Sequence, residues 1–192
     1  MADQAALVAA LDAHRPISPL EEADVARIRA LLDGGGVDPW SRDLPMHVTA
    51  SALVLHVPTG RVLLRWHERM GSWLQVGGHA DPGEDDPAAI ARREAAEETG
   101  LDDLAHFPDP GADRLVHVVV VPVPAGKGEP AHEHADLRYL LATDHPDDVV
   151  PESATASLRW LSLDAARSVV QEDNLRVTLA RAGVTLQLRS AP

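Results

Sequence analysis

The sequence has 192 residues, of which 45% are hydrophobic, 24% charged and 3% aromatic, a composition that suits one globular domain with some added elements. Its formal net charge is −13, which argues against binding to long nucleic acids or anionic membrane surfaces, because both usually require a basic patch. The chain has no cysteine, which excludes disulfides, thiolate zinc sites and a cysteine nucleophile, and no apolar run approaches the roughly 20 residues that a membrane-spanning helix needs.

Two helices are predicted ahead of the first strand. Residues 3–13 have an amphipathic helical pattern, and because this start lacks the basic region of a signal peptide, we expect a cytoplasmic protein. A second helix is predicted to follow Ser18, with Pro19 at its first position and Glu21 as the capping-box partner of Ser18. Gly34–Gly36 are predicted to end it.

From His47 onward the pattern becomes that of strands. HVTASALVLHV is β-branched and apolar, PTG turns the chain, and RVLLR returns, which predicts a β-hairpin. The later elements are predicted to be strands at 73–76, 115–123, 136–143 and LRWLSL, and helices from Pro87 to Thr99, near 164–172 and near 175–182. We therefore expect an N-terminal helical extension over residues 1–45 and a main domain over residues 46–192, with an α/β (α+β) fold and a mixed sheet.

The stretch REAAEETG crowds Glu94, Glu97 and Glu98 into the end of the predicted helix. Like charges three or four residues apart repel by roughly 0.2–0.5 kcal/mol per pair, and the negative end of the helix dipole adds to this cost. On a helical wheel, Glu94 and Glu97 share a stripe with Ile90 and Leu101, and Glu98 lies at its edge, so these side chains do not lie on a solvated helix face. A divalent cation would turn the repulsion into joint coordination, and a set of carboxylates suits Mg²⁺, Mn²⁺ or Ca²⁺.

Two neighbouring stretches have more than one interpretation. The loop GGHADPGE precedes the acidic helix, and its glycines allow the backbone to approach a metal or a phosphate closely. His132 and His134 flank Glu133, but HEH lacks the i, i+4 spacing of a helical zinc pair and lies beside a strand. We therefore interpret these histidines as surface residues or as residues behind the site. Asp136 is either a partner of the site or simply the first residue of a strand.

Together, GGHADPGEDDPAAIARREAAEETGL resembles the signature of the Nudix hydrolases, which is G, five residues, E, seven residues, then REUxEExGU with U apolar. The matching positions are Gly78, Glu84, Arg93, Glu94, Ala95, Glu97, Glu98, Gly100 and Leu101. Here eight residues, not seven, separate Glu84 from Arg93. Because an insertion inside the helix would rotate the glutamates off their face, we expect the extra residue at Asp85–Asp86 and a helix that begins at or near Pro87.

The resemblance implies a fold, an activity and a cofactor. The fold would be an α/β/α sandwich, and the activity would be hydrolysis of a diphosphate linkage in a nucleoside diphosphate derivative or similar small molecule. The cofactor would be Mg²⁺ or Mn²⁺, held by Glu94, Glu97 and Glu98 with the carbonyl of Gly78.

The resemblance also implies catalytic residues. Arg93 and Glu84 would form a supporting pair that orients Glu94, and these three residues are the catalytic candidates. The general base stays open between a glutamate of the motif and a later carboxylate, Glu133 or Glu152.

Four residues near the motif are candidates for binding the substrate. Trp73 could stack on a base or ring, although burial is the commoner fate of tryptophan. Arg65 and Arg69 could reach phosphates. His79 lies inside the loop, where contact with the substrate and a plain loop position are equally consistent with the sequence.

The expected partner is a small diphosphate compound, with no long nucleic acid and no membrane, and a homodimer stays open. One alternative is a catalytically inactive Nudix-fold module that binds nucleotides or has a regulatory role, although an intact motif argues against it. Another is an interaction protein with an acidic helix, which the shared stripe of carboxylates and apolar residues disfavours.

Overall fold

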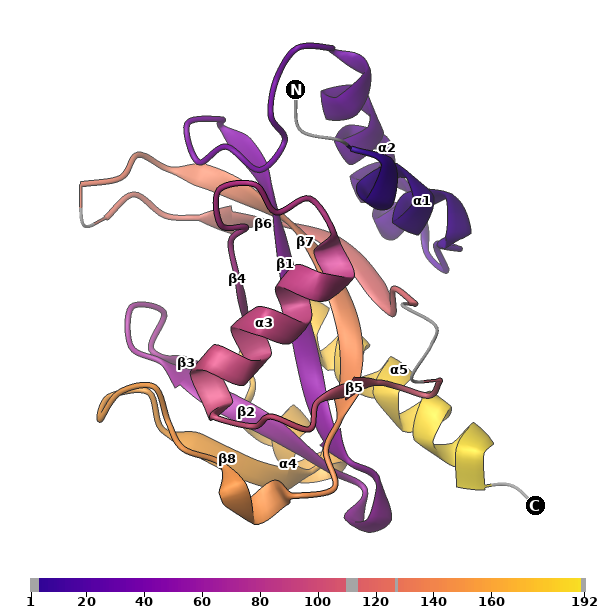
Figure 1. Ribbon diagram of the computed structural model, residues 1–192, viewed down its shortest axis with the longest axis vertical. Helices are drawn as coiled ribbons and strands as arrows, with labels where there is room; N and C mark the ends of the chain where they lie inside the picture. The colour runs from indigo at the N-terminus through magenta and orange to yellow at the C-terminus, as the bar shows by residue number, and fades with distance from the viewer. Residues whose placement is uncertain (1–3, 110–113, 127, 191–192) are drawn as a thin grey trace.

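A computed structural model describes residues 4–109, 114–126 and 128–190. The helices are α1 (Ala5–Ala13), α2 (Pro19–Asp33), α3 (Pro87–Thr99), α4 (Leu163–Val169) and α5 (Asp173–Ser190), with 3₁₀ turns at Val57–Thr59 and Pro146–Asp148. The strands are β1 (Met46–His56), β2 (Arg61–His67), β3 (Ser72–Leu74), β4 (Val76–Gly78), β5 (Ala105–His106), β6 (His117–Val123), β7 (His132–Ala142) and β8 (Leu158–Ser162) (Figure 1).

The strands of the described residues form one eight-stranded mixed sheet. Its centre is the parallel pair β1 and β7, which stay in register from Met46↔Glu133 to Leu55↔Ala142. The other pairs are antiparallel: β2 and β4 with β1, β3 and β8 with β2, and β5 and β6 with β7. The predicted mixed sheet is confirmed.

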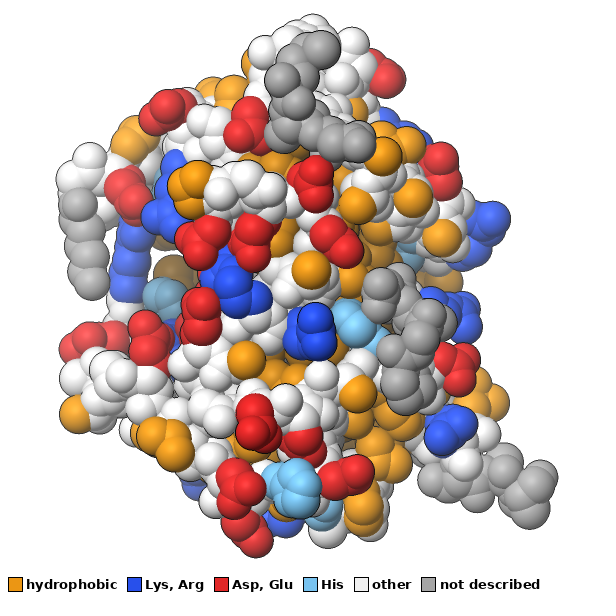
Figure 2. Space-filling model, in the orientation of Figure 1, with side chains coloured by type: hydrophobic (Ala, Val, Ile, Leu, Met, Phe, Trp, Pro, Cys, Tyr) orange, Lys and Arg blue, Asp and Glu red, His pale blue; other side chains and the backbone are white. Residues whose placement is uncertain are grey.

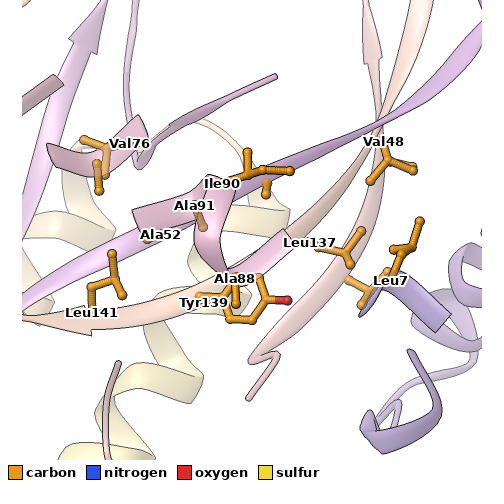
Figure 3. Close-up of a cluster of buried hydrophobic side chains, with 14 of the residues drawn as sticks. Leu7, Val48, Ala52, Val76, Ala88, Ile90, Ala91, Leu137, Tyr139 and Leu141 are labelled. Carbon is orange, nitrogen blue, oxygen red and sulfur yellow. The ribbon is translucent and has the colours of Figure 1, made fainter. Parts of the chain in front are cut away.

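Helices cover both faces of this sheet, so the predicted α/β/α sandwich is also confirmed. In Figure 1, α3 crosses in front of the sheet with α1 and α2 beside it, and α4 and α5 lie behind. The alternation of side chains along β1 divides the core in two. Val48 and Ala52 pack with Ile90 of α3 and Leu7 of α1 (Figure 3), whereas Leu53 packs on the other side with residues of α4 and α5.

The N-terminal helices are tied to the rest of the molecule by Glu21, whose side chain is 1% exposed. Ser18 caps α2 by accepting a hydrogen bond from the Glu21 amide at 3.2 Å, as predicted. The Glu21 carboxylate, however, accepts from the Ile17 amide, from the Val118 amide of β6 and from two guanidinium nitrogens of Arg181 in α5. The predicted capping-box role of Glu21 is therefore wrong, because a buried charged pair with two hydrogen bonds is stronger than a local cap.

Several boundaries differ from the predicted ones. The strand predicted at 73–76 is divided at Gln75 into β3, which pairs with β2, and β4, which pairs with β1. Strand β7 begins at His132, four residues before its predicted start, and α5 continues to Ser190. Within the described parts of the chain, no helix is both long and apolar enough to cross a membrane.

Candidate active site

The acidic motif forms a strand, a loop and a helix, as its sequence predicts. Helix α3 begins at Pro87, and the side chain of Asp86 caps it by accepting from the amides of Ala88 and Ala89. The extra residue is thus absorbed before the helix, which confirms the prediction. Glu84 still reaches Arg93 with both oxygens, at 2.8 Å from Nε and 2.8 Å from Nη2.

Arg93 connects this loop to two of the clustered carboxylates. Its Nη1 lies 3.1 Å from Glu94 Oε1 and 3.0 Å from Glu97 Oε2, and its Nη2 donates to the carbonyl of His79 at 2.9 Å. The hydrogen bond with Glu84 raises the pKa of Arg93, and the same bond lowers the pKa of Glu84. The pair is therefore charged on both sides and fixes Arg93 beside Glu94.

Glu98 is the most buried of the three clustered carboxylates. Its side chain is 12% exposed, compared with 17% for Glu94 and 57% for Glu97. Glu98 therefore lies toward the sheet, whereas the helical wheel places Glu97 on the apolar stripe and Glu98 at its edge. Glu98 accepts from the amide of Gly77 at 3.0 Å and lies 3.2 Å from Nε of Arg65. Burial, offset in part by Arg65 and by the Gly77 amide, raises the pKa of Glu98 to about 7. Burial also raises the pKa of Glu94.

Glycine is required at the end of β4 by the closeness of the backbone to its neighbours. A Cβ on Gly78 would lie 2.6 Å from Oε2 of Glu94, and a Cβ on Gly77, whose φ is +143°, would lie 2.4 Å from the side chain of Ser51. At Gly77 only glycine allows this approach, because backbone atoms of Ser51 and Ala50 are in the way, whereas at Gly78 a Cβ would displace the Glu94 carboxylate. The Glu94 carboxylate therefore rests directly against the backbone of Gly78, and Figure 2 shows acidic and basic side chains side by side on the face that carries α3.

A cavity of about 1020 Å³ begins beside Gly77 and Gly78. It lies on the face of the sheet opposite α3, and the molecule is visibly hollowed at the left of Figure 2. Its floor consists of polar side chains from β1 and β7 that are paired in register, namely His47 with His134, Thr49 with Asp136, and Ser51 with Arg138.

Asp136 is the centre of this floor. Its carboxylate accepts from Thr49 at 3.2 Å, from Ser51 at 2.9 Å, from Gln75 at 3.2 Å and from Nε of Arg138 at 2.8 Å. The sequence leaves the role of Asp136 open and assigns no role to Arg138, although Arg138 is 2% exposed. The sequence HEHADLRYL could have indicated that Asp136 and Arg138 lie side by side, because polar residues recur there at every second position, as they do on one face of a strand.

Four histidines meet at one end of the cavity: His47, His79, His132 and His134. His132 and His134, which we interpret from the sequence as surface residues or residues behind the site, both belong to β7, are partly exposed and line the cavity. Burial lowers the pKa of His47, and burial together with neighbouring rings lowers the pKa of His79 to about 3 and that of His134 to about 4. These rings are therefore neutral at neutral pH.

Arg65 and Arg69 both line the cavity, but each is already paired. Arg65 lies between Glu98 and Glu152, with 2.9 Å from its Nη2 to the Glu152 carboxylate. Arg69 bonds Glu129 at 3.0 Å and the carbonyl of Pro124 at 2.8 Å. Glu152 is thus next to the carboxylate cluster.

The remaining predicted residues lie farther from this cluster. Glu133 forms its ion pair with Arg27 of α2. Trp73 packs against the core under α4 and α5, with its ring centroid 5.5 Å from that of Trp66 and 5.3 Å from the guanidinium carbon of Arg159. Trp66 lines the cavity, whereas Trp73 is not among the described residues that line it.

Comparisons with known proteins agree with this geometry. A family model described as the NUDIX domain matches residues 45–180. Among solved structures, an Ap4A hydrolase from C. elegans is 22% identical with a TM-score of 0.57, covering 73% of this chain and 97% of that one. A dihydroneopterin triphosphate pyrophosphohydrolase from E. coli is 19% identical with a TM-score of 0.53, covering 72% and 94%. A NUDIX-family hydrolase from Clostridium perfringens is 24% identical with a TM-score of 0.55, covering 74% and 97%. No curated protein matches the chain.

Proposed function

This chain belongs to the Nudix hydrolase family, whose members hydrolyse pyrophosphate bonds in nucleoside diphosphate derivatives, and on that premise we propose that it is a metal-dependent hydrolase of a diphosphate linkage in a small molecule. One observation carries the proposal. The carboxylates of Glu94 and Glu98 lie against Gly78 and Gly77, which line the cavity. Arg93 joins Glu97 to Glu94, and Arg65 pairs with Glu98, so two arginines hold the three carboxylates together although their mutual repulsion opposes it.

The donor atoms fit a hard divalent cation. The residues that would hold Mg²⁺ or Mn²⁺ are Glu94, Glu97 and Glu98, together with the carbonyl of Gly78, and oxygen ligands of this kind are the ones these ions prefer. Burial raises the pKa values of Glu94 and Glu98, and Arg93 and Arg65 offset this only in part, so a bound cation would favour the ionised form of both carboxylates. When bound, such an ion neutralises charge on phosphate oxygens and lowers the pKa of a bound water.

Residues of the chain would supply orientation and proton transfer. We assign to Arg93 and Glu84 the orientation of Glu94, because the bidentate pair fixes the guanidinium that contacts Glu94. Of the two later carboxylates considered as general base, Glu152 is favoured, because its partner Arg65 also contacts Glu98. A base must lie within hydrogen-bond reach of the proton that it accepts, and Glu133 is paired elsewhere.

The cavity would hold the rest of the substrate. Its volume of about 1020 Å³ is at the upper end of the roughly 300–1,000 Å³ typical of small-molecule pockets. Arg65, Arg69 and His79 line it and would face an anionic ligand in a chain of net charge −13. Trp66 has the position for stacking that the sequence suggested for Trp73.

We also propose that residues 1–45 are an extension of a Nudix domain that comprises residues 46–192. The start of the family match at residue 45 supports this division. Leu7 and Leu11 of α1 and Ile28 of α2 share one core with the sheet, so the extension would not fold alone.

The test is a panel of diphosphate compounds that includes a dinucleoside polyphosphate, a pterin triphosphate and nucleotide sugars, assayed for release of phosphate or pyrophosphate with and without Mg²⁺ or Mn²⁺. We expect metal-dependent hydrolysis of at least one compound by the wild type, and loss of it in the Glu97→Gln, Glu98→Gln double variant. Asp102→Asn, an exposed carboxylate change just past α3, serves as the control. A wild type that binds these compounds but hydrolyses none would favour the inactive binding module instead.

A further inference from the structure

The histidine cluster in the cavity has the spacing of a metal site. The Nε2 atoms of His47 and His79 lie 3.1 Å apart, as do those of His132 and His134. One ligand nitrogen from each of His47, His132 and His134 lies within 4.8 Å of the other two. In a tetrahedral zinc site with Zn–N bonds of about 2.0–2.1 Å, neighbouring nitrogens are about 3.3–3.4 Å apart. Small side-chain adjustments would therefore bring the three nitrogens to that spacing.

Backbone carbonyls orient two of these rings for coordination. The Nδ1 atom of His47 lies 3.3 Å from the carbonyl of Leu44, and that of His132 lies 2.9 Å from the carbonyl of Pro130. Because a carbonyl can only accept, each Nδ1 must carry the proton, and in a neutral ring this leaves Nε2 as a bare lone pair. Both lone pairs are directed into the cluster. Histidines that bind metals almost always donate their other ring N–H to such a carbonyl or carboxylate.

The sheet fixes the positions of the three rings. His47 of β1 and His134 of β7 are register partners in the parallel pair, and His132 lies two residues before His134, on the same face of the strand. A site built on neighbouring central strands is held more rigidly than one built on loops.

From this geometry we propose that His47, His132 and His134 bind one Zn²⁺ through their Nε2 atoms, with the fourth position facing the cavity. Imidazole nitrogens suit zinc and other late transition metals, whereas Mg²⁺ prefers oxygen, so this site is chemically distinct from the carboxylate cluster. Glu129 and Asp136 lie close enough to favour a cation, and Arg42 opposes it. An open fourth position would accept water or an anionic oxygen such as that of a phosphate. The proposal does not depend on hydrolytic activity.

The test is zinc binding by the full-length protein, after removal of metal by a chelator and dialysis, measured by calorimetry and by metal analysis. We expect one Zn²⁺ per chain in the wild type. His47→Asn and His134→Asn should each weaken binding by at least about 10-fold, because even the partners of zinc ligands contribute roughly 10–100-fold. His145→Asn, which changes an exposed histidine outside the cavity, should bind zinc as the wild type does.

Two further measurements separate the possible outcomes. Co²⁺ in place of Zn²⁺ should give the intense visible bands of four-coordinate cobalt in the wild type and lose them in both histidine variants. Melting curves without metal show whether each histidine variant is folded. If one variant does not fold, zinc binding by the other variant decides the outcome. Absence of stoichiometric zinc, or unchanged binding in both folded variants, would overturn the proposal. So would loss of zinc in the Glu97→Gln, Glu98→Gln variant with retention in the histidine variants, because that result would place the metal at the carboxylates.

Discussion

The buried carboxylate of Glu98 makes stability depend on pH. Its pKa is about 7 in the folded protein and 4.5 in the reference state, so between these values the unfolded chain loses a proton that the folded chain retains. Stability therefore falls as pH rises from about 4.5 to 7, and the full cost remains above pH 7. A shift of this size corresponds to about 3 kcal/mol at most.

Glu98→Gln should remove that cost. In the absence of divalent metal, we expect the variant to lose less stability than the wild type between pH 4.5 and 7, as measured by urea denaturation across this range. The exposed Asp102→Asn should leave the profile unchanged. If Glu98→Gln and the wild type show parallel profiles, Glu98 is ionised in the folded protein and its burial has been compensated by Arg65.

Two adjacent arginines of α3 allow a matched comparison. Arg93 bonds Glu84, Glu94 and Glu97, whereas Arg92 is exposed. Arg93→Gln leaves three carboxylates without their shared cation, and we expect it to lower the free energy of unfolding by about 1–3 kcal/mol, as for loss of hydrogen bonds to a charged group. Arg92→Gln should stay within about 0.5 kcal/mol of the wild type. Equal effects of both changes in chemical denaturation would show that Arg93 does not hold the carboxylates.

Most of the residues that the sequence predicts for the site lie in one continuous motif, and Arg65 and Arg69, predicted outside it, line the cavity. Glu84, Arg93 and the clustered glutamates could be placed because strand, loop and helix follow one another directly. The cavity floor could not be assembled this way, because Thr49 and Asp136 come from strands whose pairing is long-range and has no local signal. Trp66 and Trp73 are register partners in β2 and β3 with ring centroids 5.5 Å apart, and the sequence singled out only Trp73 because this pairing is decided by tertiary structure.

At the scale of elements, the sequence predicts most helices and strands, and the errors occur where tertiary contacts decide. The strand expected at 73–76 is divided because its two halves pair with different strands, β2 and β1. Strand β7 extends back to His132 because β6 and β1 flank it on both sides. The carboxylate of Glu21 pairs with Arg181 instead of capping its own helix. The local sequence could not predict this contact, because Arg181 lies far away in the chain.

Glu21 should make the attachment of α2 sensitive to acid. Although burial raises its pKa, hydrogen bonds from Arg181, the amides of Ile17 and Val118, and His14 together lower it to about 2. The stabilisation is therefore fully present above about pH 4.5 and is lost as pH falls toward 2. It amounts to about 3 kcal/mol.

Glu21→Gln should lower stability at pH 7 by about that amount and should make the loss between pH 4.5 and 2 shallower. Its neighbour Glu22 is exposed, and Glu22→Gln is the control that should keep the acid profile of the wild type. Acid unfolding followed by circular dichroism gives both slopes. If Glu21→Gln loses stability between pH 4.5 and 2 as steeply as the wild type, protonation of the buried Glu21–Arg181 pair is not the cause of the loss in acid.

At the scale of the whole molecule, the parallel strands β1 and β7 organise both faces of the sheet. Their apolar residues face α3 and hold it so that its glutamates lie against β4, while their polar residues on the other side form the cavity floor. Gly77 and Gly78 border both regions. With a net charge of −13, the anionic substrate proposed above would have to be bound by local cations, namely Arg65, Arg69 and the proposed metal ion.

We infer that the carboxylates are crowded on α3 for catalysis, at a cost in stability. The most direct measurement compares the wild type with Glu94→Gln, in both the rate of hydrolysis of one accepted diphosphate substrate at saturating Mg²⁺ and the melting temperature without metal. We predict that the variant melts at the same temperature or slightly higher, because relief of repulsion is worth a few tenths of a kcal/mol, while turnover falls by about 10²–10⁴-fold. A variant that hydrolyses the substrate as fast as the wild type would show that Glu94 takes no part in catalysis.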